Sequence, residues 1–115
     1  MFERGEVWLA DLNPPYGTEP GKTRPVLIIQ SRALLHAGHP STCVIPLTTK
    51  LVQDAEPLRI RIPAGGRLQY ESDLLMDQIR AIDNRRLISG PLLRLPPDVI
   101  RRVEQALMAI IGIEA

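Results

Sequence analysis

The sequence predicts a small, mainly β fold of the α+β class, in which an antiparallel β-barrel or half-barrel carries one C-terminal helix. Two observations support this prediction. Short apolar runs typical of strands follow one another with proline and glycine between them, and only the segment after Leu95 shows a convincing helical pattern. At 115 residues the chain is expected to form a single domain over residues 1–115.

Three strands are predicted in the first half of the chain. They cover Glu6 to Leu12, Val26 to Gln30 and Thr42 to Leu47. The first strand has apolar residues on both faces, so we expect both faces to be partly covered. Between the first two strands, residues 13–23 contain three prolines and two glycines, which predicts a long binding loop. Residues 31–41 are expected to be a loop with one turn of helix at Arg32 to Leu35.

The second half begins with a clean alternation from Leu58 to Ile62, which predicts a strand with an apolar inner face and an arginine-bearing outer face. Residues 63–66 are expected to form a turn. The mostly apolar run from Leu74 to Ile82 is predicted to be one strand, Asp83 to Arg86 a single helical turn, and Ile88 to Leu95 a last strand or extended connection.

A helix is predicted to open at Pro96-Pro97-Asp98, because proline is favoured at a helix start and a carboxylate in the first turn. Its apolar stripe is expected to consist of Val99, Val103, Leu107, Ile110 and Ile111. Arg101, Arg102 and Glu104 are expected to face water.

Composition narrows the function classes. The apolar runs are too short to span a bilayer and the N-terminus lacks the apolar core of a signal peptide, so we expect a cytoplasmic protein with no membrane partner. The net charge of +1 means that nucleic-acid binding would have to come from a local patch. Aromatic residues are few, and Tyr16 is expected to be the only one exposed for stacking on a base.

No metal or cofactor is predicted. His36 and His39 are three residues apart, but no further cysteine, histidine or nearby acid completes a shell of ligands, so we interpret them as a solvated pair. The single cysteine, Cys43, lies in an apolar run and is expected to be a small core residue.

The strongest chemical signal is Arg24, which follows a Gly-rich loop and precedes Pro25 and a buried strand. A guanidinium retains its charge and can hold a phosphate or carboxylate with two parallel hydrogen bonds. Thr48 and Thr49 end another predicted strand, where hydroxyls can donate to phosphate. If the two strands are neighbours, Arg24 and Thr48 could converge on one anion; the alternative is that Arg24 pairs with Glu19.

Several short motifs occur in an order and spacing that are specific when taken together. They are Gly5 to Leu12, then Pro14, Gly17, Glu19, Gly21 and Arg24-Pro25-Val26, then Leu47-Thr48, and finally Asp77 to Asp83 with Arg86-Leu87. In these motifs the sequence resembles, from about Arg4 to Ile111, the MazF/PemK family of toxin endoribonucleases of type II toxin–antitoxin systems. The resemblance implies a compact PemK-like, SH3-like β-barrel with a C-terminal helix, assembled as a homodimer.

By the same resemblance, the activity is metal-independent and sequence-selective cleavage of single-stranded RNA. The 2′-hydroxyl attacks the adjacent phosphate, leaving a 2′,3′-cyclic phosphate and a 5′-hydroxyl. Arg24 and Thr48 match the family's catalytic arginine and threonine, and Glu19 matches an acid suggested to assist proton transfer.

Residues 14–23 match a mobile loop that contacts RNA and is covered by the C-terminal disordered segment of a cognate antitoxin. The residues expected to bind RNA are Pro15, Tyr16, Gly17, Thr18, Lys22, Thr49, Asp77 and Gln78.

The sequence leaves an alternative function and shows two departures from the family pattern. The alternative is a non-enzymatic toxin of the same barrel that inhibits DNA gyrase, although those relatives lack the pairing of arginine and threonine. Residues 31–41 depart from the pattern that is common after the second strand, and Asp73 stands where relatives usually carry an apolar residue.

Overall fold

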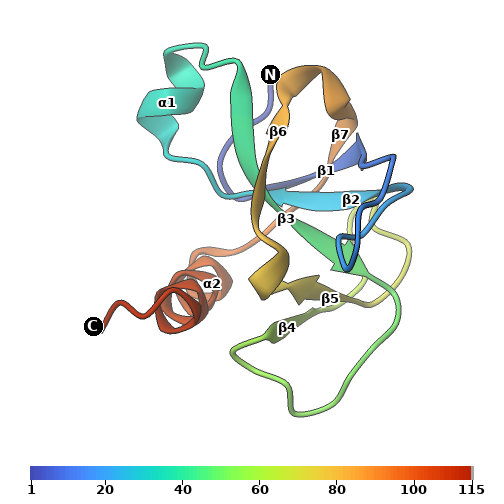
Figure 1. The fold of residues 1–115 in the computed structure, drawn as a ribbon, viewed down its shortest axis with the longest axis vertical. Helices are drawn as coiled ribbons and strands as arrows, with labels where there is room; N and C mark the ends of the chain where they lie inside the picture. The colour runs from blue at the N-terminus through green and yellow to red at the C-terminus, as the bar shows by residue number, and fades with distance from the viewer. Residues whose placement is uncertain (115) are drawn as a thin grey trace.

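A computed structural model describes residues 1–114 (Figure 1). Its strands are β1 Glu6–Asp11, β2 Thr23–Ile28, β3 Ser41–Thr48, β4 Arg59–Ile62, β5 Ser72–Leu75, β6 Arg80–Asp83 and β7 Leu87–Arg94. Its helices are α1 Arg32–His36, α2 Pro97–Ile110 and the short 3₁₀ turns η1 Met76–Gln78 and η2 Asn84–Arg86. The predicted fold class, a small α+β protein with antiparallel strands and a C-terminal helix, is confirmed.

All strand pairs are antiparallel and form a curved sheet in the order β4-β5-β3-β2-β1-β7, with β6 also paired to β3. No strand pair within residues 1–114 joins β4 to β7, so the sheet does not close. Of the two expected forms, barrel and half-barrel, the half-barrel is correct. Between these two strands, the backbone of the loop that follows β4 bonds to β7. The Arg67 amide of this loop donates to the Leu92 carbonyl at 2.7 Å.

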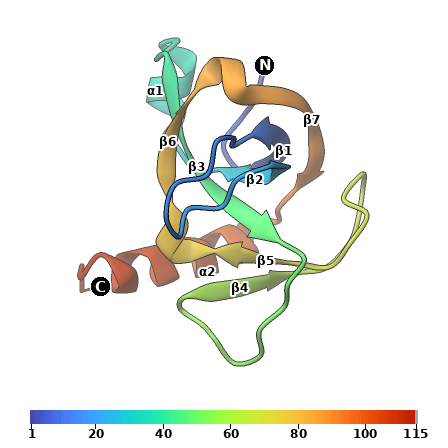
Figure 2. The same ribbon diagram turned by 45° about the vertical axis from the view of Figure 1, so that its right-hand side comes forward.

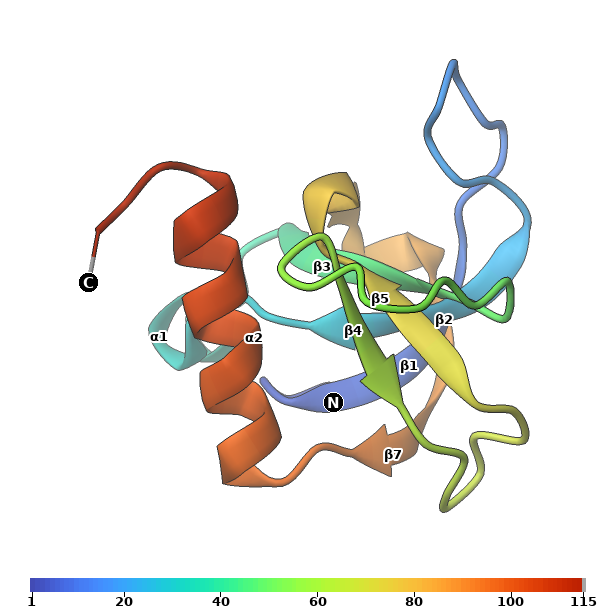
Figure 3. The same cartoon turned by 90° about the horizontal axis from the view of Figure 1, so that it is seen from below.

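The sheet separates two apolar clusters. Val7, Leu27 and Ile45 belong to a larger cluster, which α2 covers with Val103 and Ala106. Alternate positions of the same strands, including Ala10 and Val26, point into a smaller cluster. This alternation confirms that both faces of the first strand are covered. Figure 3 shows α2 on one side of the sheet and the loop between β1 and β2 projecting on the other side.

The predicted single strand from Leu74 to Ile82 is wrong. β5 pairs Leu74 with Leu47, and β6 pairs Arg80 with Val44 along the same edge of β3. The registers of these two pairings differ by three residues, and the three residues of η1 accommodate this difference. Such a break depends on pairing partners that are distant in sequence. The apolar pattern of the segment itself therefore does not reveal it.

The other elements lie close to their predicted positions. α1 exists and is one residue longer than expected, with the Ser31 hydroxyl capping it by accepting from the Leu34 amide. α2 begins at the predicted prolines, but Ile111 lies beyond its end and is exposed, so its place in the apolar stripe was wrong. The carboxylate of Glu104 pairs with Arg4 at 2.8 Å, and the Glu104 side chain remains 42% exposed.

Three loops extend from the sheet. Residues 12–22 join β1 to β2, residues 49–58 join β3 to β4, and residues 63–71 join β4 to β5; Figure 2 shows the last two in green and yellow-green. Neither α1 nor α2 is long and apolar enough to cross a membrane, and residues 1–114 contain no other α-helix.

Candidate active site

Arg24 and Thr48 are brought together by the pairing of β2 with β3. Val26 lies opposite Pro46 in this antiparallel pair, so Arg24, near the start of β2, and Thr48, the last residue of β3, lie at the same end of the two strands. β2 begins three residues earlier than predicted, so Arg24 belongs to the strand and also pairs with Ala10 of β1. The condition set from the sequence, that these two strands be neighbours, is therefore met.

The guanidinium of Arg24 is held by neutral groups. Its Nε donates to the Gly21 carbonyl at 2.9 Å and its Nη1 to the Leu47 carbonyl at 3.2 Å. Partial burial lowers the pKa of Arg24, since desolvation disfavours the charged form. No carboxylate in residues 1–114 forms an ion pair with Arg24, so the alternative of a pair with Glu19 was wrong.

Two of the five N–H donors of Arg24 are used in these bonds, and Nη2 makes no hydrogen bond to a residue of the described chain. The Thr48 hydroxyl oxygen accepts the Lys50 amide at 3.2 Å, which leaves its hydrogen available as a donor. The pair can therefore offer several hydrogen-bond donors and one positive charge to an anion.

A pocket of about 520 Å³ opens over this pair. Its walls come from the start of β2, the end of β3 and the loop before β5. They are lined by Leu9, Lys22, Thr23, Arg24, Pro25, Leu47, Thr48, Thr49, Lys50, Arg67, Leu68, Gln69, Tyr70 and Ser72. The volume exceeds that of a phosphate group and lies in the usual range for small-ligand sites.

The predicted RNA-binding residues, together with the predicted catalytic acid Glu19, divide into three groups. Lys22 and Thr49 line the main pocket together with Arg24 and Thr48. Thr18, Asp77 and Gln78 line a separate hollow of about 310 Å³ beside it.

Pro15, Tyr16, Gly17 and Glu19 are exposed in the 12–22 loop and line neither hollow. The Pro15 ring lies against the base of the loop, where a Cβ on Gly21 would come within 2.7 Å of it. Only a glycine fits there, and its carbonyl holds Arg24. The roles assigned to these four residues remain predictions.

The lining residues that were missed as site residues include four with large polar side chains, Lys50, Arg67, Gln69 and Tyr70. Tyr70 is 66% exposed, so the expectation that Tyr16 is the only exposed aromatic residue was wrong. The 63–71 loop reaches the pocket because Leu68 is buried in the core and Arg67 bonds to β7. Of these four residues, only Lys50 could have been predicted from its neighbours in sequence, because it directly follows the two threonines.

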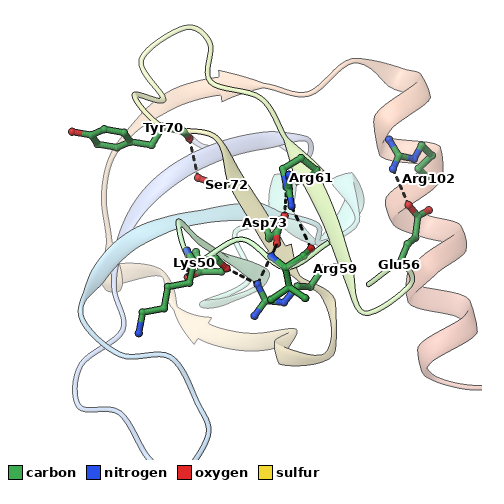
Figure 4. A network of polar contacts seen from close by, with 10 residues as sticks. Lys50, Glu56, Arg59, Arg61, Tyr70, Ser72, Asp73 and Arg102 are labelled. Carbon is green, nitrogen blue, oxygen red and sulfur yellow. Dashed lines mark hydrogen bonds and ion pairs between the residues drawn. The ribbon is translucent and has the colours of Figure 1, made fainter. Parts of the chain in front are cut away.

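A second polar cluster lies beside the pocket (Figure 4). Asp73 is 1% exposed and accepts from Arg61 Nε at 2.6 Å, Arg59 Nη1 at 3.2 Å and the Val52 amide at 2.9 Å. Burial alone would raise the pKa of Asp73, but the hydrogen bonds from Arg61, Val52 and Arg59 outweigh it and lower the pKa. This confirms the arginine-bearing outer face predicted for β4.

Comparison with known proteins identifies the family. Residues 3–111 match the model of a family described as the PemK-like, MazF-like toxin of type II toxin–antitoxin systems. The chain belongs to this toxin family. The family predicted from the sequence motifs is thereby confirmed.

Two solved structures and one curated protein illustrate how similar this toxin is to other members. Endoribonuclease EndoA of Bacillus subtilis (strain 168) is 34% identical over 109 residues, which are 93% of this chain and 91% of EndoA. MazF of Deinococcus radiodurans has a TM-score of 0.79 at 24% identity over 96% of both chains. An endoribonuclease from a mycobacterial species, solved with its cognate antitoxin, has a TM-score of 0.75 at 20% identity over 100% of this toxin and 99% of that chain. These comparisons do not favour the gyrase-inhibiting alternative.

Proposed function

We propose that this toxin cleaves single-stranded RNA in the pocket that holds Arg24 and Thr48. That the chain is a toxin endoribonuclease rests on its family and on EndoA, its 34% identical relative. The observation that carries the assignment of the pocket is that Arg24 and Thr48 line it together and that Arg24 has no carboxylate partner in residues 1–114. Its positive charge is therefore available to a phosphate.

In the proposed reaction, the ribose 2′-oxygen attacks the adjacent phosphorus and the bond from phosphorus to the 5′-oxygen breaks. The products are a 2′,3′-cyclic phosphate and a 5′-hydroxyl; the 2′-hydroxyl loses its proton and the leaving 5′-oxygen gains one. Negative charge builds on the non-bridging oxygens, where Arg24 and the Thr48 hydroxyl would donate. We expect no metal requirement, because these two groups supply the stabilising charge and hydrogen bonds.

The proton donor and acceptor are a separate question. Arginine is a poor base at neutral pH because its guanidinium group stays protonated there. Glu19 remains the candidate proposed from the family resemblance, but it lies in the exposed part of the 12–22 loop, outside the pocket lining. A role for Glu19 therefore requires this loop to move over the pocket when RNA binds.

The proposal extends to partners. We propose a homodimer whose activity is blocked by a cognate antitoxin, with a disordered C-terminal segment of the antitoxin lying over the 12–22 loop. The mycobacterial endoribonuclease solved with its antitoxin supports the antitoxin partner. The exposed tip of the loop, with Tyr16 83% exposed, offers a surface for such a segment. RNA and antitoxin would both be met in the cytoplasm.

The direct test is to incubate the purified toxin with single-stranded RNA in EDTA and to map the new ends. We expect cleavage at a short sequence motif, with cyclic phosphate and 5′-hydroxyl ends. Intact RNA, or products with 5′-phosphate ends, would refute the proposed reaction. Inhibition of DNA gyrase by a preparation that leaves RNA intact would instead support the gyrase-binding alternative.

A further inference from the structure

We propose that Lys50 is a phosphate-binding residue of the cleavage pocket and that buried Asp73 holds it there through Arg59. The inference rests on the proposed function, because its ligand is a backbone phosphate of the single-stranded RNA substrate, next to the one at the cleaved bond. Lys50 would thus form a second phosphate subsite, two residues along the chain from Thr48.

Lys50 is exposed and lines the same pocket as Arg24 and Thr48. Its backbone amide donates to the Thr48 hydroxyl, so the two residues are directly linked. No acid in residues 1–114 forms an ion pair with its ammonium group. Figure 4 shows the side chain extending away from the Asp73 cluster. A lysine in this setting neutralises a phosphate at little desolvation cost.

The backbone around Lys50 is fixed by charged groups at two points. Arg59 Nη1 donates both to the Lys50 carbonyl at 2.7 Å and to Asp73 at 3.2 Å. Arg61 Nη2 donates to the Val52 carbonyl at 3.3 Å, while the Val52 amide donates to Asp73. One carboxylate thereby anchors the chain on both sides of Leu51, next to the threonines of the pocket.

Asp73 itself is 1% exposed and pairs with Thr48 across β3 and β5, so it cannot contact RNA. Any effect of Asp73 on RNA binding must therefore pass through the residues that it positions. A purely structural role is the competing explanation, and it predicts lower stability without a specific change in phosphate binding. The two explanations differ in how binding depends on salt and on Lys50.

The experiment measures the Kd of RNA carrying a 2′-deoxy group at the cleaved position, over a series of salt concentrations. We expect Lys50→Gln to raise the Kd about tenfold and to lower the slope of log Kd against log salt by about 0.7, as for one lost phosphate contact on a single strand. The matched control is Arg102→Gln, which removes an exposed arginine paired with Glu56 at the far end of the 49–58 loop. This control should leave both quantities unchanged.

Asp73→Asn is then combined with Lys50→Gln. We expect Asp73→Asn to raise the Kd and lower the slope in the wild-type protein, but to change neither in the Lys50→Gln protein. In the Asp73→Asn protein, the single-turnover cleavage rate at saturating RNA should change by a smaller factor than the Kd. If Asp73→Asn does not fold, Arg59→Gln replaces it, because that variant keeps the bridge between Asp73 and Arg61.

Two results would overturn the inference. The first is an unchanged Kd and slope in Lys50→Gln, and the second is an equal effect of the Asp73 or Arg59 change with and without Lys50. Either result in a toxin that cleaves RNA leaves the proposed function intact. A wild-type protein that cleaves no RNA would instead contradict the proposed function.

Discussion

Arg24 on β2 and the pair Arg59 and Arg61 on β4 lie on opposite sides of β3, and their surroundings differ. Arg24 is held by two neutral carbonyls, whereas Arg59 and Arg61 both bind the buried carboxylate of Asp73. The first arrangement fixes the position of a charge without neutralising it, and the second neutralises charge to hold a loop. The comparison shows that the partner of an arginine, more than its exposure, indicates whether the residue is available to a ligand.

The largest effect is expected from Arg24→Ala. Removing the charge should lower the cleavage rate about a thousandfold, the upper end for loss of one group that stabilises a transition state. Stability should change little, because the substitution also removes a partly buried charge. Single-turnover kinetics with thermal unfolding as control tests both parts. A cleavage rate near that of the wild type would show that the charge of Arg24 does not act on the substrate.

In contrast to Arg24→Ala, the substitution Asp73→Asn should lower the stability of the fold. Removing the carboxylate leaves Arg59 and Arg61 partly buried without a counter-charge, which should cost about 3 kcal/mol of unfolding free energy. We take the low end of the range for broken buried pairs because the two arginines remain 24% and 29% exposed. Urea unfolding measures the change; a loss below about 1 kcal/mol would show that the cluster is no more than a surface ion pair.

Thr48→Val should slow cleavage by about a hundredfold, because it removes one hydrogen-bond donor from the pocket and leaves the charge of Arg24 in place. It also removes the acceptor of the Lys50 amide, so Thr48→Ser is the matched control that keeps the hydroxyl. Single-turnover rates should rank wild type and Thr48→Ser above Thr48→Val. Equal rates for Thr48→Val and wild type would remove Thr48 from the catalytic pair.

The smallest effect concerns acid stability. The folded pKa of Asp73 is lowered, so its contribution to stability is fully present above its unfolded pKa of about 3.9 and is lost as pH falls through the lower folded value. The exposed Asp83, whose pKa the hydrogen bonds from Arg85 lower to about 2, acts in the same direction over the window from about 3.9 to about 2. The difference in unfolding free energy between wild type and Asp73→Asn should therefore shrink below pH ~4. A difference that stays constant down to pH ~2 would contradict this.

Local patterns predicted most of the fold. A short apolar run located the strand around Val26, alternation located the strand around Ile60, and proline with a nearby acid located the start of α2. The break at η1 escaped prediction because it is set by two registers on one edge of β3, a relation between segments about thirty residues apart.

The site was predicted to a similar extent. Arg24 and Thr48 were recognisable from their position at strand ends, because neighbouring strands bring such ends together. Tyr70 and Arg67 could not be predicted, since the 63–71 loop reaches the pocket only through the burial of Leu68. The partners of Asp73 were equally hidden, because sequence shows a lone acid and no sign of the arginines that face it.

The central claim, that Arg24 acts because no acid neutralises it, is tested most directly by giving it one. Thr48→Asp places a carboxylate in the pocket that Arg24 lines, and Thr48→Asn is its neutral match in size and shape. Both are compared in single-turnover cleavage of single-stranded RNA in EDTA, after thermal unfolding has shown that they are folded. We predict that Thr48→Asn keeps a slow but measurable rate and that Thr48→Asp falls to the level of Arg24→Ala. Equal rates for the Asp and Asn variants would contradict the claim.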